Sequence, residues 1–128
     1  MNDITAPQTA TEEALIAALV RLIELCEASG IDFDLVVTAQ QVRSYKPDLA
    51  HFRKFAEMTG ATPGNWIHVA NSWVHDVLPA GRMGLRSVWV DRDHTGHPAK
   101  FAERRVTSMR RLPETVADVS VLPAWPVP

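Results

Sequence analysis

Apolar residues recur along the first part of the chain at the spacing of a helix that buries one face. The members of this stripe are Ile16, Leu19, Val20, Ile23 and Cys26. Thr11 is placed to cap the helix at its start, and Ser29-Gly30 is a typical ending. The pattern therefore predicts a helix with one buried side, in which Cys26 packs as a small apolar residue.

Further along, short apolar runs alternate with amphipathic stretches. The runs at 35–37, 66–70 and 87–90 are rich in β-branched or aromatic residues and predict buried strands. Helical patterns follow Pro47 and cover 73–80, and the region 106–122 is compatible with a short strand and a last helix. Strands that alternate with helices at this spacing are typical of a parallel α/β sheet.

The same pattern predicts one domain over residues 1–128. Residues 1–11 have the composition of a loose lead-in, and residues 123–128 form a proline-rich tail. We see no internal repeat and no linker between these ends.

Several polar residues are expected to meet at one edge of this sheet, because ligands of parallel sheets bind just beyond the carboxyl ends of the strands. The residues at such positions are Thr38, Asn71, Ser72 and Asp91. Lys46, held before Pro47 at a helix entrance, and Asp76, on the helix that follows Ser72, can join them. Each also has an ordinary role as a helix cap or surface residue. A carboxylate, an amide and a lysine from separate strand ends together form a polar site.

The composition of the chain limits the classes of function that it can have. The net charge is -2, and the one dense basic patch, 104–111 with four arginines, is typical of an exposed helix or loop face. We therefore expect no nucleic-acid partner. The single Cys26 excludes an internal disulfide and fits a reducing, cytoplasmic setting. No apolar run approaches the roughly 20 residues that span a bilayer, so we expect no membrane association.

The motifs also occur in a characteristic order. They are Asp34-Leu35-Val36-Val37-Thr38-Ala39, Tyr45-Lys46-Pro47-Asp48, His68-Val69-Ala70-Asn71-Ser72 with Asp76, Pro79-Ala80-Gly81, Met83-Gly84 and Val88-Trp89-Val90-Asp91-Arg92. In this order and spacing, the stretch from Phe33 to about Leu112 resembles the haloacid dehalogenase-like (HAD) hydrolase superfamily. It is most similar to the C-terminal half of the type II 2-haloacid dehalogenases.

The resemblance implies roles for four residues as candidate catalytic groups: Lys46, Asn71, Ser72 and Asp76. Lys46 matches the lysine that steadies the nucleophile and the negative charge of the substrate, and Asp76 matches the second acid of the last family motif. Asn71 stands where phosphatase members usually have the first acid. An amide is a poorer magnesium ligand than a carboxylate, which favours the metal-free dehalogenase branch. We therefore expect a small 2-haloacid-like substrate and no cofactor, with Mg²⁺ only if the phosphatase-like branch applies.

The family also has parts that this sequence does not match. Its nucleophilic aspartate lies on a first strand that would precede Met1, and the Ser or Thr after the second strand and the cap domain are also missing. The resemblance thus implies a three-layer Rossmann-like parallel sheet that is incomplete, with a gap between the strands at 35–37 and 66–70. We expect the chain to be inactive alone, and to self-associate or to pair with a partner chain that completes the sheet.

Other readings stay open at this stage. The chain is alternatively a non-catalytic binding or assembly module that keeps a HAD-like scaffold. A response-regulator-like or flavodoxin-like domain would require an acidic pocket or a phosphate loop, and the sequence has neither. Whether the 128 residues are a natural full length, a truncated frame or half of a split enzyme is also open.

Overall fold

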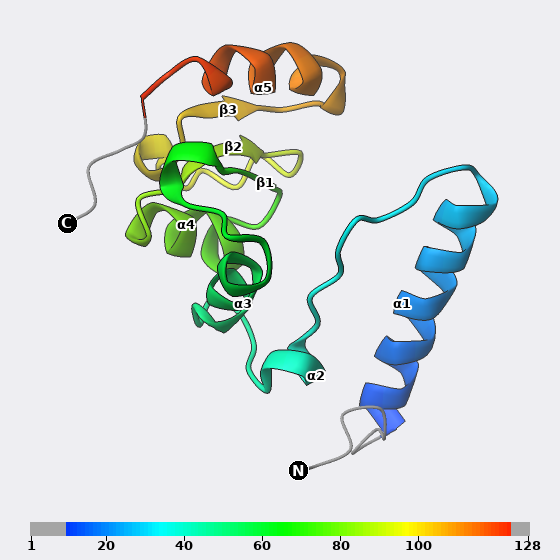
Figure 1. The fold of residues 1–128 in the computed structure, drawn as a ribbon. Coiled ribbons are helices and arrows are strands. Elements are labelled where there is room, and N and C mark those ends of the chain that lie inside the picture. Colours follow the sequence, from blue (N-terminus) through cyan, green and yellow to red (C-terminus); the bar gives the residue numbers. More distant parts are fainter. Residues whose placement is uncertain (1–9, 124–128) are drawn as a thin grey trace. The chain divides into compact units, whose positions relative to one another are not determined.

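The computed structural model describes residues 10–123 and groups the chain into two compact units, 1–43 and 44–128. Residues 1–9 and 124–128, which hold most of the expected lead-in and tail, lie outside the described residues. The boundary between the units falls inside the stretch that the sequence analysis treats as one domain. Each unit is described by itself (Figure 1). Within residues 10–123, no helix has both the length and the apolar character needed to cross a bilayer.

The first unit contains the long helix α1 (Ala10–Ala28) and the short helix α2 (Ala39–Val42). The predicted helix is confirmed, but the prediction that it buries its apolar stripe is wrong. Ile16, Leu19, Ile23 and Cys26 are only half-buried, and Val20 is 47% exposed. Among the described residues of this unit, no other helix or strand packs extensively along α1. The helix also includes Thr11, the residue expected to cap it.

The predicted strand at 35–37 is not formed in the structure. An extended segment becomes a strand only when a neighbour takes up its backbone N–H and C=O groups. No described residue pairs with this segment. Thr38, which follows it, accepts a hydrogen bond from the backbone N–H of Gln41 and caps α2.

The second unit is built on a three-stranded sheet of β1 (Ile67–Ala70), β2 (Arg86–Val90) and β3 (Arg104–Val106), in that order. β1 pairs with β2 and β2 with β3, both in parallel, so the parallel α/β fold is confirmed. The strands predicted at 66–70 and 87–90 are present as β1 and β2.

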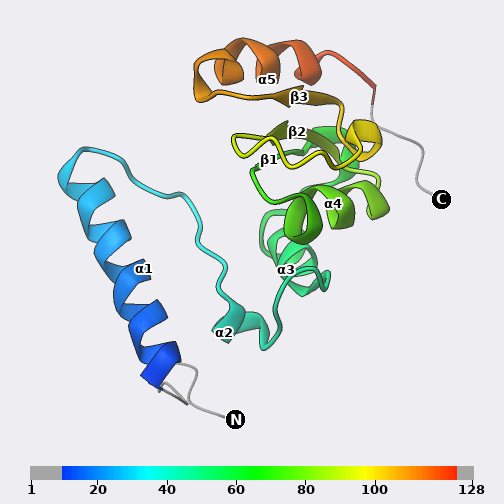
Figure 2. The ribbon, with the colours of Figure 1, turned by 180° about the vertical axis from the view of Figure 1, so that it is seen from behind.

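Helices cover this sheet. In Figures 1 and 2 the strands lie between α4 (Leu78–Arg82) and α5 (Leu112–Ser120). α5 contacts all three strands and α4 contacts β2. As a result every residue of β2 is buried, which explains the nearly continuous apolar run in the sequence of this strand.

A second group of apolar side chains lies under α3 (Ala50–Thr59), the helix predicted after Pro47. Its buried members are Phe52, Trp66, Ala80 and Leu85, with Phe55 and Ala56 packed against them. The predicted apolar face of α3 is therefore confirmed. The helix begins three residues later than the position of Pro47 suggested, because residues 46–49 form a turn.

One buried charge holds the second unit together. Arg86 opens β2 and is only 4% exposed. Its Nη1 donates to the carbonyl oxygens of Val119, Ser120 and Leu122 at 3.4, 3.3 and 2.9 Å, and its Nη2 donates to Gly64 O at 3.0 Å. The carbonyls at the end of a helix carry partial negative charge and lack partners within the helix. Arg86 therefore joins the start of β2 to the end of α5 and to the loop before β1.

We expect Arg86→Met to lower the free energy of unfolding by about 3 kcal/mol, because it removes a buried guanidinium group and leaves carbonyls that are at least partly buried without donors. Urea unfolding followed by tryptophan fluorescence measures the change. Arg53→Met, on the exposed side of α3, is the matched control and should change stability by less than about 0.5 kcal/mol. Equal stability of the two variants would contradict the role given to Arg86.

Candidate active site

The turn after β1 places the candidate residues. Asn71 and Ser72 lead from β1 into a π-helical turn, Trp73–Val77, which continues directly into α4. Ser72 Oγ accepts from the backbone N–H of His75 at 3.3 Å, and Ser72 O accepts from that of Val77 at 3.2 Å. The helix predicted at 73–80 thus begins as one wide turn. Such turns occur often at functional sites.

Asp76, on this turn, forms an ion pair with Lys46. Lys46 Nζ lies 2.7 Å from Asp76 Oδ1, and the two side chains are 36% and 10% exposed. Lys46 belongs to the turn before α3, thirty residues earlier in the sequence. The structure therefore brings together the two charged residues that the sequence analysis selected.

His68 is a third member of this cluster, and the sequence analysis missed it. Its Nε2 lies 3.1 Å from the same oxygen, Asp76 Oδ1, and its ring packs against Phe52 with centroids 4.9 Å apart. The sequence signal for His68 was its polar side chain inside an otherwise apolar strand.

Asp76 is ionised in this setting. Burial alone would raise the pKa of its carboxyl group, but hydrogen bonds from His68 and Lys46 and the positive charge of Lys46 outweigh burial and hold the pKa below its usual range. The pKa of the nearby His51 is also lowered. Burial and the charge of Lys46 lower the pKa of His51, against smaller opposing effects of Asp76 and Asp48.

Asn71 and Ser72 lie at the predicted strand end but make other contacts. Asn71 Nδ2 donates to Val90 O at 2.8 Å, and Asn71 O accepts from Trp89 Nε1 at 3.0 Å. Ser72 Oγ lies 2.9 Å from His75 Nδ1. Both residues thus fasten the turn after β1, Asn71 by binding β2, and their catalytic roles stay predictions.

Asp91 follows β2 as predicted and is 1% exposed. Its Oδ2 pairs with Arg105 at 2.8 Å, and its Oδ1 accepts from the backbone N–H of Thr95 at 3.2 Å. Burial favours a raised pKa for Asp91, yet the hydrogen bonds from Arg105 and Thr95 and the charge of Arg105 lower it. Asp91 therefore ties β3 to the loop after β2. Thr38 lies in the other unit, where it caps α2.

A magnesium ion does not fit the residues of this cluster alone. The described residues contain no group of three His, Cys, Asp or Glu side chains that could hold a metal. Asp76 Oδ1 is already bound by an ammonium group and an imidazole. Magnesium prefers several oxygen ligands in octahedral geometry.

The loop after β2 is held over the π-helical turn by Trp73. Its Nε1 donates to Pro98 O at 2.8 Å, and its indole stacks on His97 with ring centroids 4.6 Å apart and planes inclined by 9°. Trp73 also contacts Phe101, at 6.0 Å between ring centroids. These contacts give the polar loop at 91–99 a fixed position beside the turn that carries Asp76.

Comparison with known proteins finds similar proteins by sequence and by structure. No family model matches the chain. A curated relative from Danio rerio, haloacid dehalogenase-like hydrolase domain-containing protein 3, is 32% identical over 60 residues. The crystal structure of a HAD phosphatase from Thermococcus onnurineus superposes with a TM-score of 0.60 and 26% identity, covering 71% of this chain. These matches support the HAD-like hydrolase family.

The fold of the described residues is an α/β fold with a parallel sheet, and it matches the Rossmann-like fold of this HAD phosphatase. The chain spans 25% of the length of the curated relative and 43% of the length of the solved phosphatase. One relative is named a hydrolase and the other a phosphatase, so neither singles out the dehalogenase branch.

The ion pair predicts a pH dependence of stability. The pKa of Asp76 is lower in the folded protein than its ordinary value of 3.8, so its contribution to stability is fully present above that value. The contribution disappears as the pH falls through the folded-state pKa. Between about pH 5 and pH 2, the unfolding free energy should therefore fall more steeply for the wild type than for Asp76→Asn.

Urea unfolding at a series of pH values measures these slopes. Asp118→Asn removes an exposed carboxylate of α5 and is the matched control, expected to keep the wild-type slope. Identical slopes for the wild type and Asp76→Asn would show that Asp76 is not stabilised as an anion.

Proposed function

We propose that this chain supplies the lysine and aspartate side of a HAD-like hydrolase site, of the 2-haloacid dehalogenase type. The observation that carries the proposal is the 2.7 Å ion pair between Lys46 and the nearly buried Asp76. The pair lies beside the turn after β1, where the working residues of a parallel sheet gather.

The cluster can fix a positive charge in place. Asp76 holds the Lys46 ammonium through one oxygen, and His68 binds that same oxygen from β1. A preorganised ammonium of this kind stabilises a carboxylate nucleophile and the negative charge that develops during the reaction. His68 acts as a positioning residue, because it contacts Asp76.

The reaction of the family also requires an aspartate that these residues do not provide. In a dehalogenase, the carboxylate oxygen attacks the carbon that bears the halogen, and the halide leaves with its bonding pair. Water then cleaves the resulting ester to a hydroxy acid and frees the carboxylate. We propose that this aspartate belongs to a further stretch of polypeptide and that the 128 residues are inactive alone. Asn71 supports the dehalogenase branch because an amide at this position adds no acidic ligand for magnesium.

The free side of β1 offers a place for that polypeptide. Among the described residues, β1 pairs only with β2, and Val69 on β1 is 39% exposed. An unpaired strand edge is a template for another strand. The same observation favours the second candidate, a non-catalytic module that binds a partner through this edge.

A hybrid enzyme tests the proposal. The structurally matched part of the Thermococcus onnurineus phosphatase is replaced by the matching part of this chain, and hydrolysis is followed with p-nitrophenyl phosphate and with 2-chloropropionate. We expect the hybrid to release chloride from 2-chloropropionate. Lys46→Ala or Asp76→Ala in the hybrid should lower kcat by about 100-fold, the usual loss when a charge-stabilising group is removed.

The control is Arg53→Ala, which removes an exposed cation of α3 and should leave kcat unchanged. Release of nitrophenol but not chloride would assign the phosphatase branch instead. A hybrid that has native circular dichroism and hydrolyses neither substrate would favour the non-catalytic module. Unchanged kcat after Lys46→Ala would reject the role of the ion pair.

A further inference from the structure

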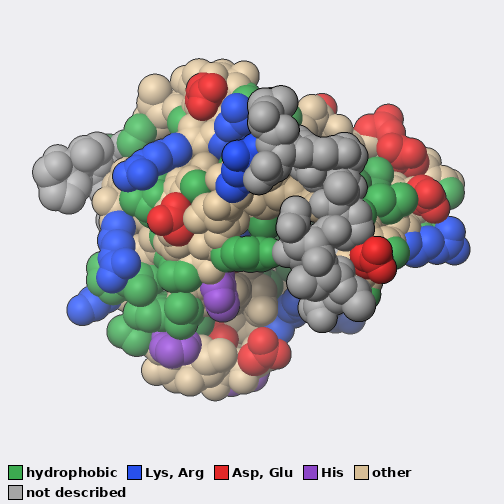
Figure 3. All heavy atoms as spheres, turned by 90° about the horizontal axis from the view of Figure 1, so that it is seen from below, with side chains coloured by type: hydrophobic (Ala, Val, Ile, Leu, Met, Phe, Trp, Pro, Cys, Tyr) green, Lys and Arg blue, Asp and Glu red, His purple; other side chains and the backbone are tan. Residues whose placement is uncertain are grey.

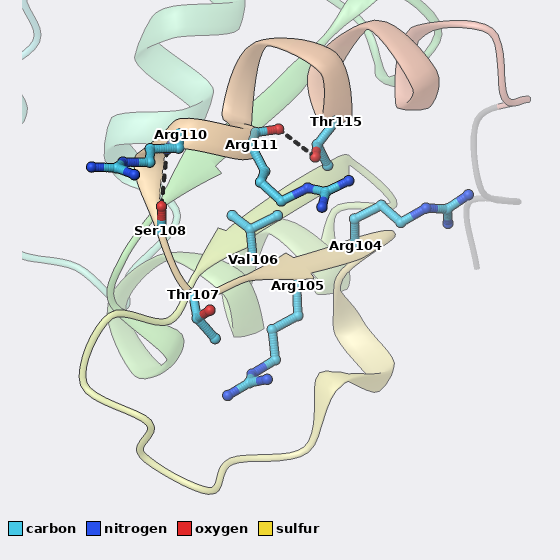
Figure 4. A pocket seen from close by; sticks show the side chains of 8 residues that line it. All are labelled: Arg104, Arg105, Val106, Thr107, Ser108, Arg110, Arg111 and Thr115. Carbon is cyan, nitrogen blue, oxygen red and sulfur yellow. Dashed lines mark hydrogen bonds between the residues drawn. The ribbon is translucent and has the colours of Figure 1, made fainter.

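A second polar feature of the molecule shares no residue with the Lys46–Asp76 cluster. It is a hollow of about 650 Å³ next to β3 and the start of α5 (Figure 4). The residues that line it are Arg104, Arg105, Val106, Thr107, Ser108, Arg110, Arg111 and Thr115. We call it the arginine hollow. Its size lies in the range of small-molecule sites.

The lining is strongly positive, although the whole chain carries a net charge of -2. Four of the eight lining residues are arginines and none is acidic. On the face of the molecule shown in Figure 3, by contrast, acidic and basic side chains are interspersed. The sequence predicts an ordinary exposed face for the basic patch at 104–111. In the structure, this patch surrounds a concave surface.

The four arginines of the hollow differ in whether a carboxylate neutralises their positive charge. Arg105 points to the opposite side of β3 from α5 and pairs with the buried Asp91. Arg111 pairs with Glu114, but both side chains are exposed, at 75% and 60%, so this contact is weak and exchangeable. Arg104 and Arg110 have no carboxylate partner within the described part of the chain.

Two guanidinium groups lie on the same side of β3. Alternation along the strand directs Arg104 and Val106 toward α5, and the Arg111 side chain extends over Val106 from above (Figure 4). Thr115, on the first turns of α5, fixes the backbone of Arg111 because its hydroxyl donates to Arg111 O at 2.6 Å. Ser108 similarly accepts from the backbone N–H of Arg110 at 3.1 Å.

We infer that the arginine hollow binds a small anion with more than one phosphate group, with Arg104 and Arg111 as its main ligands. Guanidinium groups match phosphate oxygens in geometry and form charge-assisted pairs with them. A ligand with two phosphates has separate groups of acceptor oxygens for the two arginines. Its negative charge compensates Arg104 and competes with Glu114 for Arg111.

Isothermal titration calorimetry of the full chain with inorganic pyrophosphate tests the inference. We expect saturable binding of one pyrophosphate per chain. The double variant Arg104→Gln, Arg111→Gln should weaken it at least about tenfold, because each charge-assisted contact contributes more than 1 kcal/mol. Arg53→Gln, which removes an exposed cation of α3, should leave the affinity unchanged.

Three outcomes would overturn the inference. These are the absence of saturable binding, equal weakening by Arg53→Gln, and binding of a long polyanion such as heparin without binding of pyrophosphate. Amide chemical shifts give a second readout that does not depend on the variants. Pyrophosphate should shift the amide resonances of Thr107, Ser108 and Thr115, and shifts confined to other residues would also reject the site.

Discussion

The second unit depends on a charged side chain that is buried with no carboxylate partner among the described residues. Arg86 stands at the start of the central strand β2, and its guanidinium group binds three carbonyls near the end of α5 and one before β1. The arrangement is favourable because the end of a helix presents unpaired, partly negative oxygens. Since a bare charge in this position would be costly, the backbone around Arg86 has little freedom to move. The sheet edge that carries the candidate site is built on this frame.

At the candidate site, too, a buried charge is compensated by the groups that surround it. One oxygen of Asp76 accepts from both Lys46 and His68, which come from a turn and a strand far apart in the sequence. Because Asp76 is buried, the loss of either donor would leave its charge less compensated. The π-helical turn after β1 sets the position of this carboxylate, and Asn71 and Ser72 hold the turn. Residues that resemble a catalytic motif therefore also maintain the geometry of the site.

The segment at 35–37 shows the limit of a local pattern. The β-branched residues of this segment favour an extended backbone, so its composition predicts a strand. Strand formation is a property of a pair, however, and no described residue pairs with it. The apolar stripe of α1 gives the same lesson, since Val20 stays 47% exposed without a layer to cover it.

The sequence by itself determined the parallel α/β class, the strands β1 and β2, the apolar face of α3, and Lys46 and Asp76 as candidate residues. These features follow from short-range periodicity and from motif order, which a sequence records directly. Only the tertiary structure decided that His68 shares the carboxylate oxygen, that Asn71 binds β2, and that Arg104 and Arg111 lie on one side of β3. Each of these depends on strand register or on the direction of a side chain across the fold, and neither is written in the local pattern of residues.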